Sequence, residues 1–155
     1  MTTDTEITIK VMPEQLVMSK LCVATLAELP HTFSESIPEV WNYVTDHGGQ
    51  LDGRPFARYY ELTPERVVVE IGFPVVAHLD GDDTIVPELL PGGEIAFLPV
   101  YGPYHKLRES YAKIHEWLKL NGRRTAGQEW EVYITDPGEE PDQDKWLIEI
   151  YCPLK

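Results

Sequence analysis

One order of elements occurs twice in this 155-residue chain, and it leaves few folds open. Apolar residues at intervals of three and four predict two amphipathic helices, at residues 34–47 and 104–120. Ser34 is the expected N-cap of the first helix, and Pro38 is expected in its first turn. A strand-like segment precedes each helix and two follow it. These segments are residues 8–24, interrupted near Pro13, then 56–61, 66–75, 93–101, 130–135 and 146–152.

The two halves also correspond weakly in sequence. The segment "GRPFARYY" aligns with "GQEWEVYI", which pairs Tyr59 with Tyr133 and Ala57 with Glu131. A single β-α-β-β unit is too small to bury a core alone. We therefore predict one α+β domain, residues 1–155, with pseudo-repeats at about 6–76 and 88–155. Its duplicated β-α-β-β units would form an antiparallel sheet with two helices on one face and a central groove, the usual place for a ligand.

Charge and composition exclude several classes of protein. The net charge of −13 opposes direct nucleic-acid binding, which needs Lys and Arg against phosphate, and mildly favours cationic ligands. No apolar run approaches the ~20 residues of a membrane helix, and the N-terminus lacks an export signal pattern. We expect a cytoplasmic protein in which Cys22 and Cys152 are buried, reduced thiols.

Glu131 is the first candidate functional residue. Alternation along its strand places Trp130, Val132 and Ile134 on one face and Glu131 with Tyr133 on the other. One interpretation is a surface carboxylate in water or beside an arginine, because acidic residues are mostly exposed. The other is a pocket residue that neutralises a cation or acts as a general acid or base. The residues of the strand alone leave both open.

Aromatic side chains are the candidate walls of such a pocket. Flat cations bind aromatic faces, each contact contributing about 0.5–2 kcal/mol, and packing within the sheet or core is the competing interpretation. Trp130 and Trp146 are expected to pack under the helices. The candidate ligand-binding residues, besides Glu131, are Tyr59, Tyr133, Tyr101, Phe73, Tyr111 and Trp117.

The sequence implies no metal and no cofactor. His105 and His115 are ten residues apart on one predicted helix, about 15 Å in rise, and are too distant to share an ion. The segment "LDGDDT" lacks the glycine and final glutamate of a calcium loop. No glycine-rich phosphate-binding loop is present either.

Several segments together resemble the GyrI-like family of small-molecule-binding domains. They are "LPGGEIAFLPVYGPYHKLRESYAKIHEWL", "GQEWEVYITDP" and "LIEIYCPLK", with "GRPFARYYE" and "VVVEIGFPV" in the first half. Such domains are fused to MerR-type and AraC-type multidrug regulators and also occur alone. The resemblance covers nearly the whole chain. It implies a duplicated fold with a groove, a buried glutamate at the position of Glu131 that neutralises lipophilic cations, and aromatic residues lining the site.

The resemblance also implies three alternative functions. The first is a standalone domain that binds hydrophobic, aromatic, often cationic drugs or toxins, for sequestration or for sensing with a protein partner such as a regulator. The second is a hydrolase of cyclopropane-bearing genotoxins, in which Glu131 activates water or protonates a leaving oxygen and Tyr133 assists. The third is an inhibitor of DNA gyrase. We expect no room for a helix-turn-helix before the first strand, and therefore not a complete transcription factor of that type unless a partner chain acts with it.

Overall fold

The structure is a computed structural model that describes residues 7–103, 106–136 and 138–155. The chain divides into two compact units: unit 1 comprises residues 1–13 and 92–155, and unit 2 comprises residues 14–91. Each unit contains antiparallel strands and one α-helix, so the predicted α+β class is confirmed. No helix within the described residues is long and apolar enough to cross a membrane.

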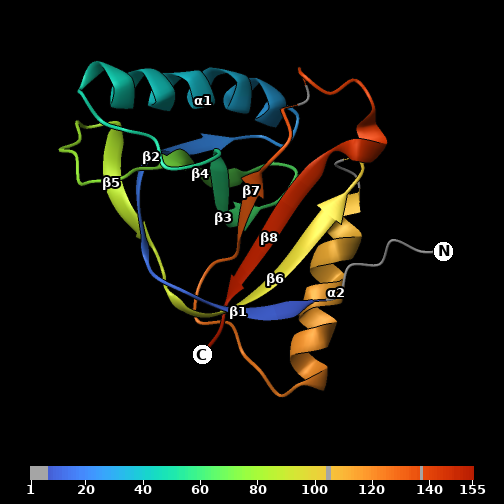
Figure 1. Ribbon diagram of the computed structural model, residues 1–155. Coiled ribbons are helices and arrows are strands. Elements are labelled where there is room, and N and C mark those ends of the chain that lie inside the picture. Colours follow the sequence, from blue (N-terminus) through green and yellow to red (C-terminus); the bar gives the residue numbers. More distant parts are fainter. Residues whose placement is uncertain (1–6, 104–105, 137) are drawn as a thin grey trace. The chain divides into compact units, whose positions relative to one another are not determined.

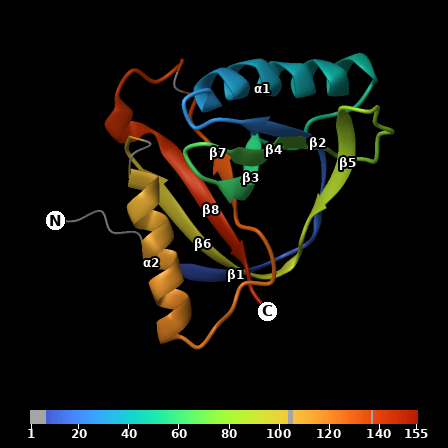
Figure 2. The same ribbon diagram turned by 180° about the vertical axis from the view of Figure 1, so that it is seen from behind.

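Unit 2 is a four-stranded antiparallel sheet with a helix on one face. Its strands are β2 (Gln15–Ala24), β3 (Phe56–Leu62), β4 (Val67–Pro74) and β5 (Ile85–Leu90), paired in the order β3-β4-β2-β5. Helix α1 (Leu29–Asp46) lies along β2 and β4 (Figure 2). The core between helix and sheet consists of Met18, Val40, Val44, Phe73, Val75 and Ile85.

The start of α1 differs from the prediction. The helix begins at Leu29 rather than at Ser34, and Pro38 lies inside it instead of in its first turn. Pro30 occupies the first turn, where its missing N–H removes no intrahelical hydrogen bond. Ser34 therefore caps nothing, and its hydroxyl donates to the carbonyl oxygen of His31 at 2.9 Å. The helix contains two prolines, Pro30 and Pro38, and the first of them marks where the helix begins.

Unit 1 has the same composition of elements. Its strands are β1 (Thr8–Met12), β6 (Gly93–Tyr101), β7 (Trp130–Tyr133) and β8 (Leu147–Pro153), paired in the order β1-β6-β8-β7. A short 3-10 helix, η2 (Gln143–Lys145), precedes β8. Helix α2 (Leu107–Leu120) lies beside β6 and β8 (Figure 1). The predicted first residues of this helix, 104 and 105, lie outside the described residues.

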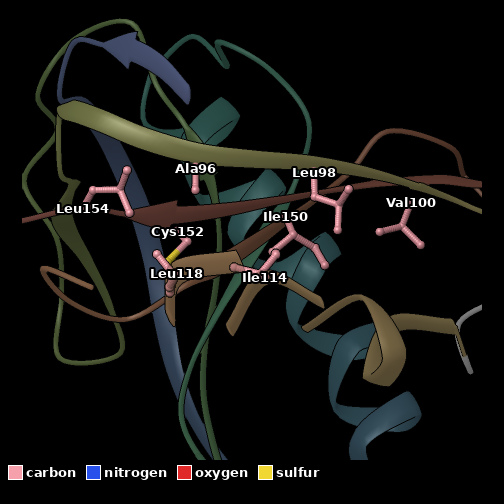
Figure 3. Packing of buried hydrophobic residues seen from close by; sticks show 8 residues of the cluster. All are labelled: Ala96, Leu98, Val100, Ile114, Leu118, Ile150, Cys152 and Leu154. Carbon is pink, nitrogen blue, oxygen red and sulfur yellow. The ribbon is translucent and has the colours of Figure 1, made fainter. Parts of the chain in front are cut away.

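The core of unit 1 lies between α2 and one face of its sheet (Figure 3). The buried residues of this α2 core are Ala96, Leu98, Val100, Ile114, Leu118, Ile150, Cys152 and Leu154. Alternate residues of β6 and β8 supply most of them, because successive side chains of a strand point to opposite faces. Tyr111 and Trp117, on α2, are partly buried against this cluster.

Two strands depart from the sequence prediction. The segment predicted as one interrupted strand at 8–24 is two strands, and β1 pairs with β6 while β2 pairs with β4 and β5. Strand β5 was not predicted, and it contains Pro87, a residue that is uncommon within strands. It lies at the end of the strand order of its unit, where a residue without an N–H is tolerated.

The strand pairs of the two units follow one pattern. Ala57 on β3 faces Ile71 on β4, and Glu131 on β7 faces Ile150 on β8. One residue further on, Arg58 faces Glu70. The corresponding pair in unit 1 is Val132 and Glu149. The predicted groove between the halves and the repeat boundaries at 6–76 and 88–155 stay predictions.

Candidate ligand-binding site

Glu131 lies beneath helix α2. It faces Ile150 across the β7–β8 pair, and Ile150 belongs to the α2 core, so the Glu131 side chain is on the α2 face of the sheet. Only 3% of Glu131 is exposed. The Tyr111 hydroxyl of α2 donates a hydrogen bond to its Oε1 at 2.8 Å, and the Tyr133 hydroxyl donates to its Oε2 at 2.6 Å. This excludes the interpretation of Glu131 as a surface carboxylate.

The environment of Glu131 favours its protonated form. Burial raises the pKa of its carboxyl, and the hydrogen bonds from Tyr133 and Tyr111 oppose that rise. The negative charge of Glu129 raises the pKa further. None of the ion pairs among the described residues involves Glu131. Glu131 is thus a buried acid bonded by two neutral hydroxyls.

Glu70, the buried carboxylate of unit 2, has the cationic partner that Glu131 lacks among the described residues. Glu70 accepts a hydrogen bond from Arg58 Nε at 2.7 Å and from the Ser19 hydroxyl at 2.6 Å. The Tyr60 hydroxyl donates to it at 3.1 Å. Arg58, Glu70 and Glu131 are the three buried charged side chains among the described residues. Two of them form an ion pair with each other, whereas Glu131 has no cationic partner in the described part of the chain.

The structure brings three of the predicted site residues together in unit 1: Glu131, Tyr111 and Tyr133. Trp117 is on the same helix as Tyr111 and packs against the α2 core. Tyr101 is at the end of β6, 48% exposed, one residue after Val100 of the α2 core. Alternation therefore places Tyr101 on the sheet face opposite Glu131.

Two other candidates, Tyr59 and Phe73, belong to unit 2. Tyr59 is partly buried on β3, opposite Val69. Phe73 is 3% exposed, and its ring meets Trp41 of α1 edge to face, with 5.6 Å between ring centroids. Phe73 is thus part of the core beneath α1. A place for either residue beside Glu131 stays a prediction.

Trp130 does not pack under a helix as expected. It stacks on Tyr151, with ring centroids 5.6 Å apart and planes at 8°, and Tyr151 contacts Phe97 at 5.1 Å. Both partners alternate with α2-core residues, so this stack lies on the sheet face away from α2. The ammonium of Lys10 sits over the Phe97 ring at 3.6 Å. Trp146 instead donates its Nε1–H to the Glu140 carbonyl oxygen at 2.8 Å.

The chain matches the model of the GyrI-like small-molecule-binding domain over residues 5–155. It belongs to the GyrI-like family. Among curated protein sequences no match was found. The C-terminal domain of EcmrR superposes on this chain with a TM-score of 0.84 and 23% identity, covering 97% of both chains.

Longer and more distant structures share the GyrI-like fold. EcmrR in complex with DNA gives a TM-score of 0.85 at 22% identity, covering 97% of this chain and 57% of EcmrR. This chain therefore spans a little more than half of that relative. SAV2435 bound to tetraphenylphosphonium gives 0.66 at 11% identity, over 97% and 94% of the two chains. A hydrolase from Listeria innocua gives 0.66 at 10%, over 99% and 94%. At these identities the likeness shows the fold alone.

Metal-ligating side chains form no cluster in the part of the chain that the structure describes. No group of three or more His, Cys, Asp or Glu side chains within the described residues is placed to hold an ion. His115 contacts Glu129 instead, with 2.6 Å between Nε2 and Oε1, and His105 lies outside the described residues. Cys22 and Cys152 are both buried and free of disulfide bonds.

Proposed function

We propose that this GyrI-like domain binds hydrophobic, aromatic and often cationic small molecules at Glu131. The role would be sequestration of a drug or toxin, or sensing together with a separate partner chain. The observation that carries the proposal is the state of Glu131, which is 3% exposed and bonded by two hydroxyls but by no cation among the described residues. Such a group is costly to ionise, and a bound cation supplies the missing charge.

The tyrosines give this site a second source of affinity. Tyr111 and Tyr133 hold their hydroxyls on Glu131, which keeps two aromatic rings next to the carboxyl. A cation that approaches Glu131 also meets these rings, at about 0.5–2 kcal/mol for each cation–π contact. Because the carboxyl is nearly inaccessible, binding has to displace at least one of the two hydroxyls.

Isothermal titration calorimetry with tetraphenylphosphonium tests the proposal, because the related SAV2435 was solved with that cation. We expect binding by the wild-type chain and a loss of at least about tenfold in affinity for Glu131→Gln, which keeps the shape of the side chain. Glu149→Gln is the matched control. Glu149 is partly buried on the neighbouring strand, faces the other side of the sheet and accepts a hydrogen bond from Tyr151 at 2.8 Å. Equal affinities for the wild type and Glu131→Gln would refute the proposal.

A second candidate function is hydrolysis in the same site, and the 2.6 Å bond between Tyr133 and Glu131 favours it. A carboxyl with a raised pKa is suited to donate a proton to a leaving atom, while its ionised form accepts a proton from an attacking water. In both roles the Tyr133 hydroxyl can hold the Glu131 carboxyl in place. The net reaction adds one water across the bond that opens. The likeness to a hydrolase from Listeria innocua supports testing this activity.

Incubation with a cyclopropane-bearing toxin, followed by mass spectrometry, distinguishes hydrolysis from binding. An enzyme converts the toxin to its water adduct over many turnovers, whereas a binding domain protects at most one equivalent. Product formation that persists in Glu131→Gln would exclude the acid–base role of Glu131. Tyr133→Phe is expected to lower the rate of product formation more than it lowers affinity, because the hydroxyl acts on the reacting atoms.

A further inference from the structure

Glu129, two residues before Glu131, has an unsatisfied carboxylate oxygen. Its Oε1 lies 2.6 Å from Nε2 of His115, on helix α2. Its Oε2 is buried and accepts no hydrogen bond from any described residue. A buried acceptor without a donor costs about 1–3 kcal/mol, and more when it is charged. Such atoms are rare in native proteins and call for a specific explanation.

Geometry places Glu129 under the same helix as Glu131. Tyr111 and His115 are one turn apart on α2, about 6 Å along the axis, and they contact Glu131 and Glu129 respectively. Residues two apart in an extended chain are separated by about 7 Å and point to the same side. The two carboxyl groups therefore lie side by side on the α2 face, each bonded by a side chain from a successive helical turn.

The electrostatic effects of Glu129 agree with this position. Its charge raises the pKa of Glu131, for which burial is the larger cause. Burial raises the pKa of the Cys152 thiol in the α2 core, and the charge of Glu129 raises that pKa further. Its ion-pair partner among the described residues is His115, whose side chain is 58% exposed. The space beneath α2 thus holds two acidic groups, and no Lys or Arg forms an ion pair with either within the described part of the chain.

We propose that Glu129 is a specificity-determining residue of the Glu131 site, and that the site selects cations carrying N–H groups, such as protonated amines and amidines, over quaternary ammonium or phosphonium ions. This inference rests on the proposed binding function. A protonated amine offers several N–H donors, so it can bond to Glu131 and to the free Oε2 of Glu129 together. A quaternary cation has charge without donors, and it leaves Oε2 buried and unsatisfied.

One cation can bridge the carboxyl groups of Glu129 and Glu131. Charge-assisted N–H···O bonds have lengths of about 2.7–2.9 Å. A single nitrogen therefore spans carboxylate oxygens that are roughly 4–5 Å apart, which is compatible with carboxyl groups on residues about 7 Å apart. An amidine spans more, because its two nitrogens diverge.

The test uses two probes with the same aromatic body, (1-naphthylmethyl)ammonium and its N,N,N-trimethyl analogue, titrated calorimetrically into three proteins. The wild type is expected to bind the ammonium at least about tenfold more tightly. Glu129→Gln keeps the acceptor for His115 but replaces Oε2 with an NH2 group, so we expect it to lose this preference while still binding the trimethyl cation. Glu131→Gln is expected to weaken both probes. Circular dichroism melts confirm that each variant is folded.

The outcomes separate this inference from the binding function beneath it. If the wild type binds both probes equally and Glu131→Gln weakens both, the role of Glu129 is overturned and the binding proposal stands. The role of Glu129 is also overturned if Glu129→Gln still prefers the ammonium probe. Failure of the wild type to bind either probe or tetraphenylphosphonium overturns both.

Discussion

Replacing Tyr133 with Phe tests the central hydrogen bond of the site with the least disturbance of packing. The change removes one hydroxyl, which donates to Glu131 Oε2 at 2.6 Å, and keeps the ring. Because Glu131 is 3% exposed, water has little access to take the place of the lost donor. A hydrogen bond to a charged group contributes about 1.5–3 kcal/mol, and one to a neutral group about 0.5–1.5 kcal/mol. We expect Tyr133→Phe to destabilise the fold by the larger amount when Glu131 is ionised.

The effect of Tyr133→Phe depends on pH in a defined direction. The Tyr133 bond lowers the pKa of Glu131 against the larger, opposite effect of burial, so it favours the ionised carboxylate. Its contribution to the free energy of unfolding is therefore full above the folded-state pKa of Glu131. As the pH falls through that pKa, the carboxyl becomes neutral and the contribution decreases. The destabilisation caused by Tyr133→Phe should accordingly be larger at pH 9 than at pH 4.5.

Urea unfolding of four proteins measures this coupling: the wild type, Tyr133→Phe, Glu131→Gln and the double variant. At pH 9 we expect a coupling free energy between the two positions of about 0.5–3 kcal/mol. In the Glu131→Gln background, Tyr133→Phe should cost less and its cost should not vary with pH. If Tyr133→Phe costs the same with and without the Glu131 carboxyl, the bond does not stabilise an ionised Glu131.

Three other predictions follow from the buried groups. Burial raises the pKa of Glu131, so between the unfolded-state and folded-state pKa values the folded chain holds a proton that the unfolded chain releases. The stability of the wild type relative to Glu131→Gln should therefore fall as the pH rises from about 4.5 through the folded-state pKa. A difference that stays constant in urea titrations from pH 4 to 9 would contradict this. Arg58→Met leaves Glu70 buried without its ion pair and should cost about 3–5 kcal/mol in urea unfolding, with recovery in the double variant Arg58→Met/Glu70→Leu; an additive double variant would argue against the pairing. Burial, with a smaller effect from Glu129, raises the pKa of Cys152 to about 12, and its exposure is 0%, so iodoacetamide at pH 8 should label it more than about a hundredfold more slowly in the native chain than in urea, as mass spectrometry can show.

Local pattern was sufficient to predict the elements that carry the site. Alternation along residues 130–135 identified the strand and placed Glu131 on the same face as Tyr133, and the 4-3-4 spacing that ends at Leu118 identified the helix. Both signals depend only on which positions are apolar. Which face lies under the helix was predicted wrongly, because Trp130 was expected there and the structure places Glu131 there instead. Two of the failures of local pattern involve prolines: Pro30 begins α1 earlier than the apolar stripe suggests, and Pro87 lies within β5. In each case proline occupies a place where its missing N–H has no consequence.

Alternation placed Tyr133 beside Glu131, but the other partners of the site residues could not be predicted from pattern, because they come from distant parts of the chain. Tyr111 precedes Glu131 by 20 residues, and only the packing of α2 on the sheet brings its hydroxyl to the carboxyl. Glu129 was missed entirely. A glutamate just before a strand is ordinary in sequence, and its unsatisfied oxygen is a property of the tertiary structure alone. Its spacing of two residues from Glu131 was the one signal available.

We propose that Glu131 is a site residue rather than part of the scaffold, and the two strand pairs support this proposal. In unit 2 the pair Arg58–Glu70 joins β3 to β4, and the adjacent position on β3 is Ala57. The corresponding positions on β7 are Val132 and Glu131. Among its described residues, unit 1 thus lacks the buried cation and has an additional buried acid. An alanine is compatible with the same pattern of strands, as unit 2 shows, so a carboxyl at this position costs stability that the fold does not require. A ligand that provides the missing positive charge is the simplest physical reason for its presence.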